Sequence, residues 1–177
     1  MTKLLNDYKS INEIVEYLLN NINIFNPRYQ WVTKSGAGYE KEFCELLNWK
    51  FVDKRHWDCE YKDYKIELKK TKSNGIQIDE IRYAEEIVLD NYECNQNIIT
   101  IFIEVYPDKS KKKGVKRLYV ARNEEVIKLL NFPNKEYCKL LVERQQNLNT
   151  SLSFTHRLKY IDIKKLSVCI PFDKLIK

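Results

Sequence analysis

Apolar residues recur at helical spacing near the start of the chain. Over residues 10–25 they fall three and four positions apart, which predicts an amphipathic helix. Ser10 precedes the apolar positions and is expected to cap this helix. The positions that carry the pattern are Ile11, Ile14, Val15, Leu18, Leu19 and Ile22.

A second amphipathic helix is predicted just after Gly36 and Gly38. Glu40 shares a face of this helix with Cys44 and Leu47, because residues three and four apart are neighbours on a helix surface. The helix is therefore expected to hold one carboxylate beside its apolar side. The inward apolar positions are Tyr39, Phe43, Leu46 and Leu47.

Alternating side chains then predict a β-hairpin. Residues 64–70 alternate between apolar and charged side chains, the two-residue period of a strand with two different faces. Strands are expected over residues 53–60 and 64–70, with the turn near Lys62-Asp63. If the hairpin is symmetric about that turn, Asp58 lies directly opposite Glu67.

The remaining elements complete an α/β order. Helices are expected over 76–89, 124–130 and 135–147, and strands over 98–106, 117–121 and 158–170. Helix, hairpin, helix, strand, strand, helix predicts an α/β (α+β) fold with a central mixed sheet flanked by helices.

Composition narrows the class of protein. The chain has 177 residues with 44% hydrophobic residues and a formal net charge of +6, which favours one domain over residues 1–177 with a basic surface. No apolar stretch is long enough to span a membrane, and charges come too early for a signal peptide, so we expect a cytoplasmic protein without a membrane partner.

Metal and nucleotide motifs are mostly missing from the sequence. The five cysteines are never spaced as CxxC and are expected to be core or neutral surface residues, and the only histidines are His56 and His156, so no zinc site is expected. The glycines at 36 and 38 lack the Lys-Ser/Thr ending of a P-loop, so no nucleotide cofactor is expected.

The informative residues are the facing carboxylates of the hairpin. Asp58 and Glu67 would repel each other and are best tolerated around a cation, and Mg²⁺ commonly takes one or two carboxylates plus substrate oxygens. Lys69 lies on the same face and could position the attacking water or neutralise a phosphate. Glu40 could add a metal or water contact. These residues predict a phosphodiester hydrolysis site with Asp58 and Glu67 as Mg²⁺ ligands.

Two other interpretations of the same segment stay open. A second Glu-x-Lys triplet, Glu60-Tyr61-Lys62 with Asp53 upstream, would form the site in a different register. Alternating charges also occur on solvated sheet faces, so Glu67 and Lys69 could have no chemical role.

The same residues carry a family resemblance. Gly38-Tyr39-Glu40, then Asp58, then Ile66-Glu67-Leu68-Lys69-Lys70 resemble the PD-(D/E)xK nuclease superfamily, in particular its type II restriction endonucleases. The resemblance covers roughly residues 36–106 and implies a catalytic core over about 36–122. It also implies that the segment from Gly75 to Ala84 is the helix after the Glu-x-Lys strand, with Gln77 near the site.

Polar segments outside this core could bind DNA. The loop from Lys109 to Arg117 carries six cations and no acid, which is typical of solvated loops but would hold phosphate near a nuclease site. The segment from 145 to 157 carries groups that can read base edges, and residues 123–177 are expected to supply recognition or dimerisation elements. The candidate DNA contacts are Lys70, Gln77, Lys111, Lys112, Lys113, Arg117, Gln145, Asn147 and Arg157; Gln146, Asn149 and His156 belong to the same polar stretch.

Together these features predict a Mg²⁺-dependent, sequence-specific endonuclease of double-stranded DNA. Its active form is expected to be a homodimer, because two-fold symmetry presents two sites to two antiparallel strands. The alternatives are a structure-selective repair or junction-resolving nuclease of the same fold, and a noncatalytic nucleic-acid-binding module.

Overall fold

The central strand of the fold is apolar along its whole length. Every residue of β5 (Ile98–Val105) is buried, as expected for a strand with neighbours on both edges and cover on both faces. The structure is a computed structural model that describes residues 2–26, 30–34, 37–54, 56–71, 75–88, 98–148, 155–166 and 168–171.

Six strands form the main sheet, in the order β1-β2-β3-β5-β6-β8. Strands β3 and β5 are parallel, and the other neighbouring pairs are antiparallel. A separate antiparallel ribbon is formed by β4 and β7. The other strands are β1 (Lys50–Phe51), β2 (Cys59–Tyr61), β3 (Tyr64–Thr71), β4 (Gly75–Asp79), β6 (Val115–Arg122), β7 (Thr155–Lys159) and β8 (Val168–Ile170).

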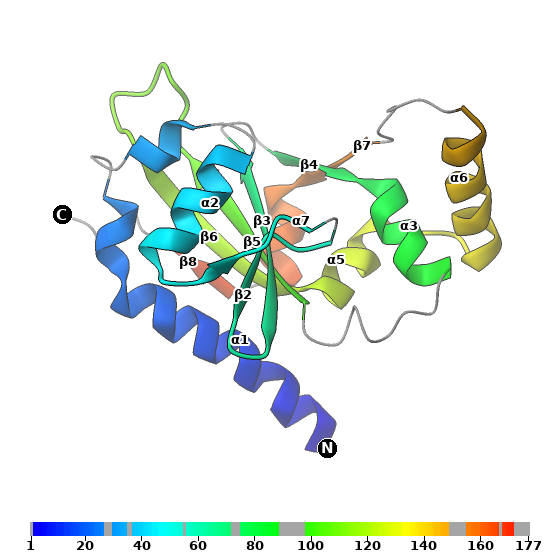
Figure 1. Cartoon of the computed structure of the whole chain (residues 1–177), viewed down its shortest axis with the longest axis horizontal. Coiled ribbons are helices and arrows are strands. Elements are labelled where there is room, and N and C mark those ends of the chain that lie inside the picture. The colour runs from blue at the N-terminus through cyan, green and yellow to red at the C-terminus, as the bar shows by residue number, and fades with distance from the viewer. Residues whose placement is uncertain are drawn as a thin grey trace.

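Helices cover both faces of this sheet (Figure 1). One face packs against α1, α2, η1 and η2, and the other against α3, α5, α7 and the β4–β7 ribbon. Helix α6 packs on α3 at one end of the molecule. The mixed sheet flanked by helices confirms the predicted fold class. The helices are α1 (Thr2–Asn20), η1 (Ile22–Phe25), η2 (Gln30–Thr33), α2 (Ala37–Leu46), α3 (Glu80–Val88), α5 (Asn123–Leu130), α6 (Lys135–Leu148) and α7 (Tyr160–Leu166).

The hairpin register is confirmed over β2 and β3. The ladder pairs Cys59 with Ile66 and Tyr61 with Tyr64, which places the turn at residues 62 and 63 as predicted. Lys62 takes up a left-handed conformation there, with φ 52°. The first strand is much shorter than the predicted 53–60, because the chain at 52–58 turns back on itself instead of continuing the ladder.

The predicted helix over 76–89 is wrong at its start. Residues 75–79 form β4 and the helix begins only at Glu80, since Ile76 and Ile78 point to the core with the two-residue period of a strand. The side chain of Asp79 ends the strand by accepting a hydrogen bond from the Ile81 N–H at 3.1 Å. Residue 89 lies outside the described residues.

Two further boundaries differ from the predictions. Helix α1 begins eight residues before Ser10, which therefore lies inside the helix and does not cap it, and residues 22–25 form a separate 3-10 turn. The predicted strand over 158–170 is divided into β7, α7 and β8, because Ile163 packs into the core from a helical turn.

The structure joins two of the cysteines. Cys44 of α2 and Cys59 of β2 form a disulfide with a Cα–Cα distance of 6.5 Å; both lie in the core, as expected, but the bond between them was not predicted. Cys138 and Cys169 are in no disulfide within the described part of the chain, and Cys94 lies outside the described residues. Among the helices described, none is long and apolar enough to cross a membrane.

Candidate active site

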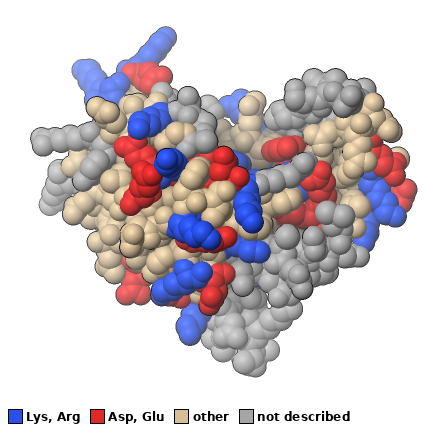
Figure 2. All heavy atoms as spheres, viewed as in Figure 1, with Lys and Arg blue, Asp and Glu red and all other residues tan. Residues whose placement is uncertain are grey.

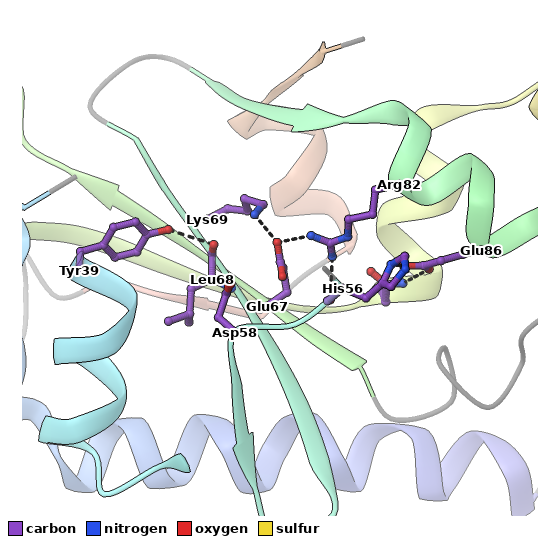
Figure 3. A network of polar contacts seen from close by, with 9 residues as sticks. Tyr39, His56, Asp58, Glu67, Leu68, Lys69, Arg82 and Glu86 are labelled. Carbon is purple, nitrogen blue, oxygen red and sulfur yellow. Dashed lines mark hydrogen bonds and ion pairs between the residues drawn. The ribbon is translucent and has the colours of Figure 1, made fainter. Parts of the chain in front are cut away.

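The site begins where β2 stops pairing with β3. The Asp58 N–H donates to the Ile66 carbonyl at 2.8 Å, whereas a continued ladder would join Asp58 to Glu67. Two backbone groups of Leu68 are therefore satisfied by side chains. Asp58 Oδ2 accepts from the Leu68 N–H at 2.6 Å, and the Tyr39 hydroxyl donates to the Leu68 carbonyl at 3.0 Å (Figure 3).

Three carboxylates meet at this opening in the sheet edge. One ligand oxygen from each of Glu40, Asp53 and Asp58 lies within 4.8 Å of the other two. Glu40 comes from the first turn of α2, and Asp53 comes from the loop before β2. The loop folds back through hydrogen bonds from the N–H groups of Val52 and Asp53 to the Asp58 carbonyl, at 2.9 and 3.2 Å.

Burial makes two of these carboxylates, Asp58 and Glu40, costly to ionise. Asp58 is only 6% exposed, and its burial, with the nearby charge of Glu67, raises its pKa to about 8. Burial also raises the pKa of Glu40. A cation among the carboxylates would remove this cost, and a set of oxygen donors alone suits a hard ion such as Mg²⁺.

Glu67 takes part in a different contact. It is buried, and its Oε1 forms ion pairs with both Lys69 and Arg82, which approach it from two sides (Figure 3). The structure thus brings Glu67 and Lys69 together as predicted. The carboxylate cluster around Asp58, however, contains Asp53 where the sequence predicted Glu67.

Arg82 was not predicted, and it links the site to a buried network. Its second guanidinium nitrogen donates to the His56 carbonyl at 2.9 Å. His56 Nδ1 lies 3.1 Å from Glu86, and Asn123 donates to the other Glu86 oxygen at 2.6 Å. The sequence signal was the four-residue spacing of Arg82 and Glu86, which puts opposite charges on one face of the first helix after the Glu-x-Lys strand.

The alternative register does not assemble a site. Glu60 pairs with Lys50 at 2.8 Å, and Lys62 pairs with Glu13 beside the turn. Of that set only Asp53 reaches the carboxylate cluster.

The predicted DNA contacts are spread over several surfaces. The Lys70 ammonium donates to the carbonyls of Val32 and Lys34, so this side chain ties β3 to η2. Arg117 lies 3.4 Å from Glu104 on the sheet. Gln77 and Arg157 face each other across the β4–β7 ribbon.

The other predicted contacts lie on a loop and on a helix. Lys111, Lys112 and Lys113 are exposed in the β5–β6 loop, which projects at the upper left of Figures 1 and 2. Gln145 and Asn147 lie near the end of α6, half-buried and exposed respectively. Asn149 and the His156 side chain lie outside the described residues.

In comparisons with known proteins, no family model matches the chain, and no curated protein is significantly similar to it. The geometry therefore carries the functional argument. A carboxylate cluster beside a buried Glu-Lys pair can hold a cation and place an ammonium next to it, an arrangement suited to hydrolysis of a charged ester.

Proposed function

We propose that this protein is a Mg²⁺-dependent endonuclease of double-stranded DNA, of the restriction type. The observation that carries the proposal is the convergence of Asp58, Glu40 and Asp53 beside the Glu67–Lys69 pair, at a sheet edge of a basic chain. The resemblance of these residues to the PD-(D/E)xK superfamily supports the same conclusion.

Asp58 and Glu40 belong both to the cluster and to the sequence motif, and Asp58 is the more buried of the two. We assign both, with Asp53, to the cation, because their oxygens already lie within 4.8 Å of one another. Bound there, Mg²⁺ would polarise a phosphate oxygen and acidify a bound water. Glu67 could join this set as the sequence predicts, at the cost of its contact with Arg82.

We assign Lys69 to orient the attacking water or to neutralise negative charge on the phosphate. Its ammonium is fixed by Glu67, its side chain remains 26% exposed, and an ammonium so placed can hold the attacking water or stabilise negative charge on a phosphate. Arg82 holds Glu67 from the other side and is a positioning residue.

The test is cleavage of plasmid and phage DNA by the purified protein, with Mg²⁺ or with EDTA. We expect discrete fragments with Mg²⁺ only, and loss of cleavage in Asp58→Asn and in Lys69→Ala. Asp63→Asn, in the exposed hairpin turn, and Lys50→Ala are the matched controls and should cleave normally. Absence of metal-dependent cleavage on any unmodified DNA, or an unchanged Lys69→Ala, would show that the proposal is wrong.

The fragments distinguish a sequence-specific restriction endonuclease from a repair or junction-resolving nuclease of the same fold. Defined bands on linear duplex mean sequence-specific cutting, whereas cutting only at branches, flaps or single strands means repair or junction resolution. Because the described part of the chain holds one such site, we propose that the cutting form is a homodimer. A monomer in light scattering with and without DNA, together with nicking of one strand, would contradict this.

One observation favours the noncatalytic alternative. Glu67 is already neutralised by Lys69 and Arg82, as in a purely structural ion network. In that case DNA binding would fall steeply with salt, Glu67→Gln would leave it unchanged, and no cleavage would be seen.

A further inference from the structure

The β4–β7 ribbon has one buried face and one exposed face. On the exposed face Gln77 lies directly opposite Arg157, and Lys159 lies opposite Gly75. Gln77, Arg157 and Lys159 are all exposed. The residues of the buried face are Ile76, Ile78 and Leu158.

Gly75 lets the Arg157 side chain lie close across the ribbon. A Cβ at position 75 would meet the Leu158 carbonyl oxygen at 2.5 Å and Arg157 Nε at 3.3 Å. The first distance is too short for any side chain without a shift of the backbone. The Arg157 side chain therefore crosses the ribbon beside Gly75, where a larger residue would crowd it.

Three polar side chains of this face have no protein partner within the described part of the chain, whereas Asp79 at the end of β4 accepts the hydrogen bond from the Ile81 N–H. Gln77, Arg157 and Lys159 form no side-chain hydrogen bond or ion pair with another described residue. Lys116 and Arg117 on the main sheet differ, since both lie against Glu104. The ribbon thus offers two cations and an amide to a ligand outside the protein.

Both ends of β4 are tied to the strand that carries Glu67 and Lys69. At the start of β4, the Thr71 hydroxyl donates to the Gly75 carbonyl at 3.2 Å, two residues beyond Lys69. Past its end, Arg82 forms the ion pair with Glu67. The exposed face is therefore held at a fixed place relative to the candidate active site. Figure 1 shows the ribbon on the upper side of the molecule, where β4 leads into α3.

We propose that this face enters a groove of the DNA duplex, where Gln77 and Arg157 read neighbouring bases and Lys159 contacts phosphate; the inference rests on the proposed endonuclease function. A two-stranded ribbon fits the major groove. Side chains opposite each other on a ladder have Cβ atoms about 4.5–5.5 Å apart, between one and two base steps of about 3.4 Å, so two long side chains can reach neighbouring base pairs. Gln pairs best with adenine and Arg with guanine.

The experiment selects bound duplexes from a pool of oligonucleotides with a randomised centre, in Ca²⁺ and in EDTA, and sequences them. The proteins compared are the wild type, Gln77→Ala, Arg157→Ala, Arg157→Lys and the control Lys50→Ala, which lies at the hairpin end away from the ribbon. The affinity of each for the wild type's preferred duplex is then measured against salt.

We expect Gln77→Ala and Arg157→Ala each to lose preference at one base pair, with affinity for the preferred duplex falling about 5- to 150-fold. Arg157→Lys keeps the charge but not the two-point contact, so it should lose the preference while keeping the salt slope. Lys50→Ala should match the wild type. Wild-type preferences and affinities in both ribbon variants, or a wild type that binds duplex without preference, would overturn the proposal.

The cleavage assay keeps the two proposals apart. Duplex binding that depends on Arg157, in a protein that never cleaves, would retain the ribbon proposal and reject the endonuclease. Cleavage by both ribbon variants at the same positions as the wild type would retain the endonuclease proposal and reject the ribbon proposal.

Discussion

Replacing Asp58 with Asn should remove a pH-dependent cost to stability that the carboxylate cluster creates. An unfolded aspartate releases its proton near pH 3.8, whereas in the folded protein the pKa of Asp58 is raised to about 8 by burial and by Glu67. The folded state therefore binds more protons between these values. Its stability without metal must fall as the pH rises from about 4 to about 8.

The size of the effect follows from the shift. One pKa unit corresponds to about 1.4 kcal/mol, so a shift from 3.8 to about 8 costs on the order of 5 kcal/mol once Asp58 is fully ionised. Asn cannot ionise, and its side-chain oxygen can still accept the hydrogen bond from the Leu68 N–H. The metal-free variant should be about as stable as the wild type near pH 4 and more stable by several kcal/mol near pH 9.

Urea unfolding in EDTA across this pH range measures the difference, with Asp63→Asn as the control for loss of an exposed carboxylate. Ca²⁺ at about 100 times its dissociation constant should add about 2.7 kcal/mol to the wild type and much less to Asp58→Asn. A difference between the two proteins that does not change with pH would refute the argument for a buried carboxylate. Equal stabilisation of both by Ca²⁺ would place the cation away from Asp58.

Three further predictions concern the contacts around the site. Reducing the Cys44–Cys59 disulfide, which closes a loop with a sequence separation of 15, should cost about 3 kcal/mol in urea unfolding, and an unchanged midpoint would contradict it. Arg82→Ala should lower stability by about 3–5 kcal/mol, because it leaves Glu67 without one of its buried partners, and Arg122→Ala on the surface is the comparison. Tyr39→Phe should cost about 1–3 kcal/mol, since it leaves the buried Leu68 carbonyl without its hydroxyl donor; thermal melts that match the wild type would rule this out.

The hairpin shows how far the sequence could predict the structure. The alternation over 64–70 and the turn at Lys62-Asp63 fixed the register of β2 and β3 correctly, because a strand with one apolar face can pair in only one way. The same reasoning extended the ladder to Asp58. Only the three-dimensional path of residues 52–58, which fold back onto the Asp58 carbonyl, shows why the ladder ends there.

The segments predicted wrongly are those whose apolar positions fit both the period of a helix and the period of a strand. Residues 76–89 hold isoleucines at positions compatible with a helix, and only the pairing with β7 shows that Ile76 and Ile78 belong to a strand. The partner strand comes about 80 residues later in the chain, so no local pattern could reveal it. The Cys44–Cys59 disulfide was missed for a similar reason, since it depends on how α2 packs against β2.

The charges around the site suggest why the sequence-based choice of ligands was incomplete. Three carboxylates form the cluster, Glu40, Asp53 and Asp58, and Glu67 lies beside it with two cations, Lys69 and Arg82. With every group ionised the set carries a net charge of minus two. Protons can compensate for part of this charge, consistent with the raised pKa values of Asp58 and Glu40, and one divalent cation would balance it in full. Because both cations contact Glu67, the uncompensated charge lies on the other three carboxylates, and these are the ones we expect a metal ion to occupy.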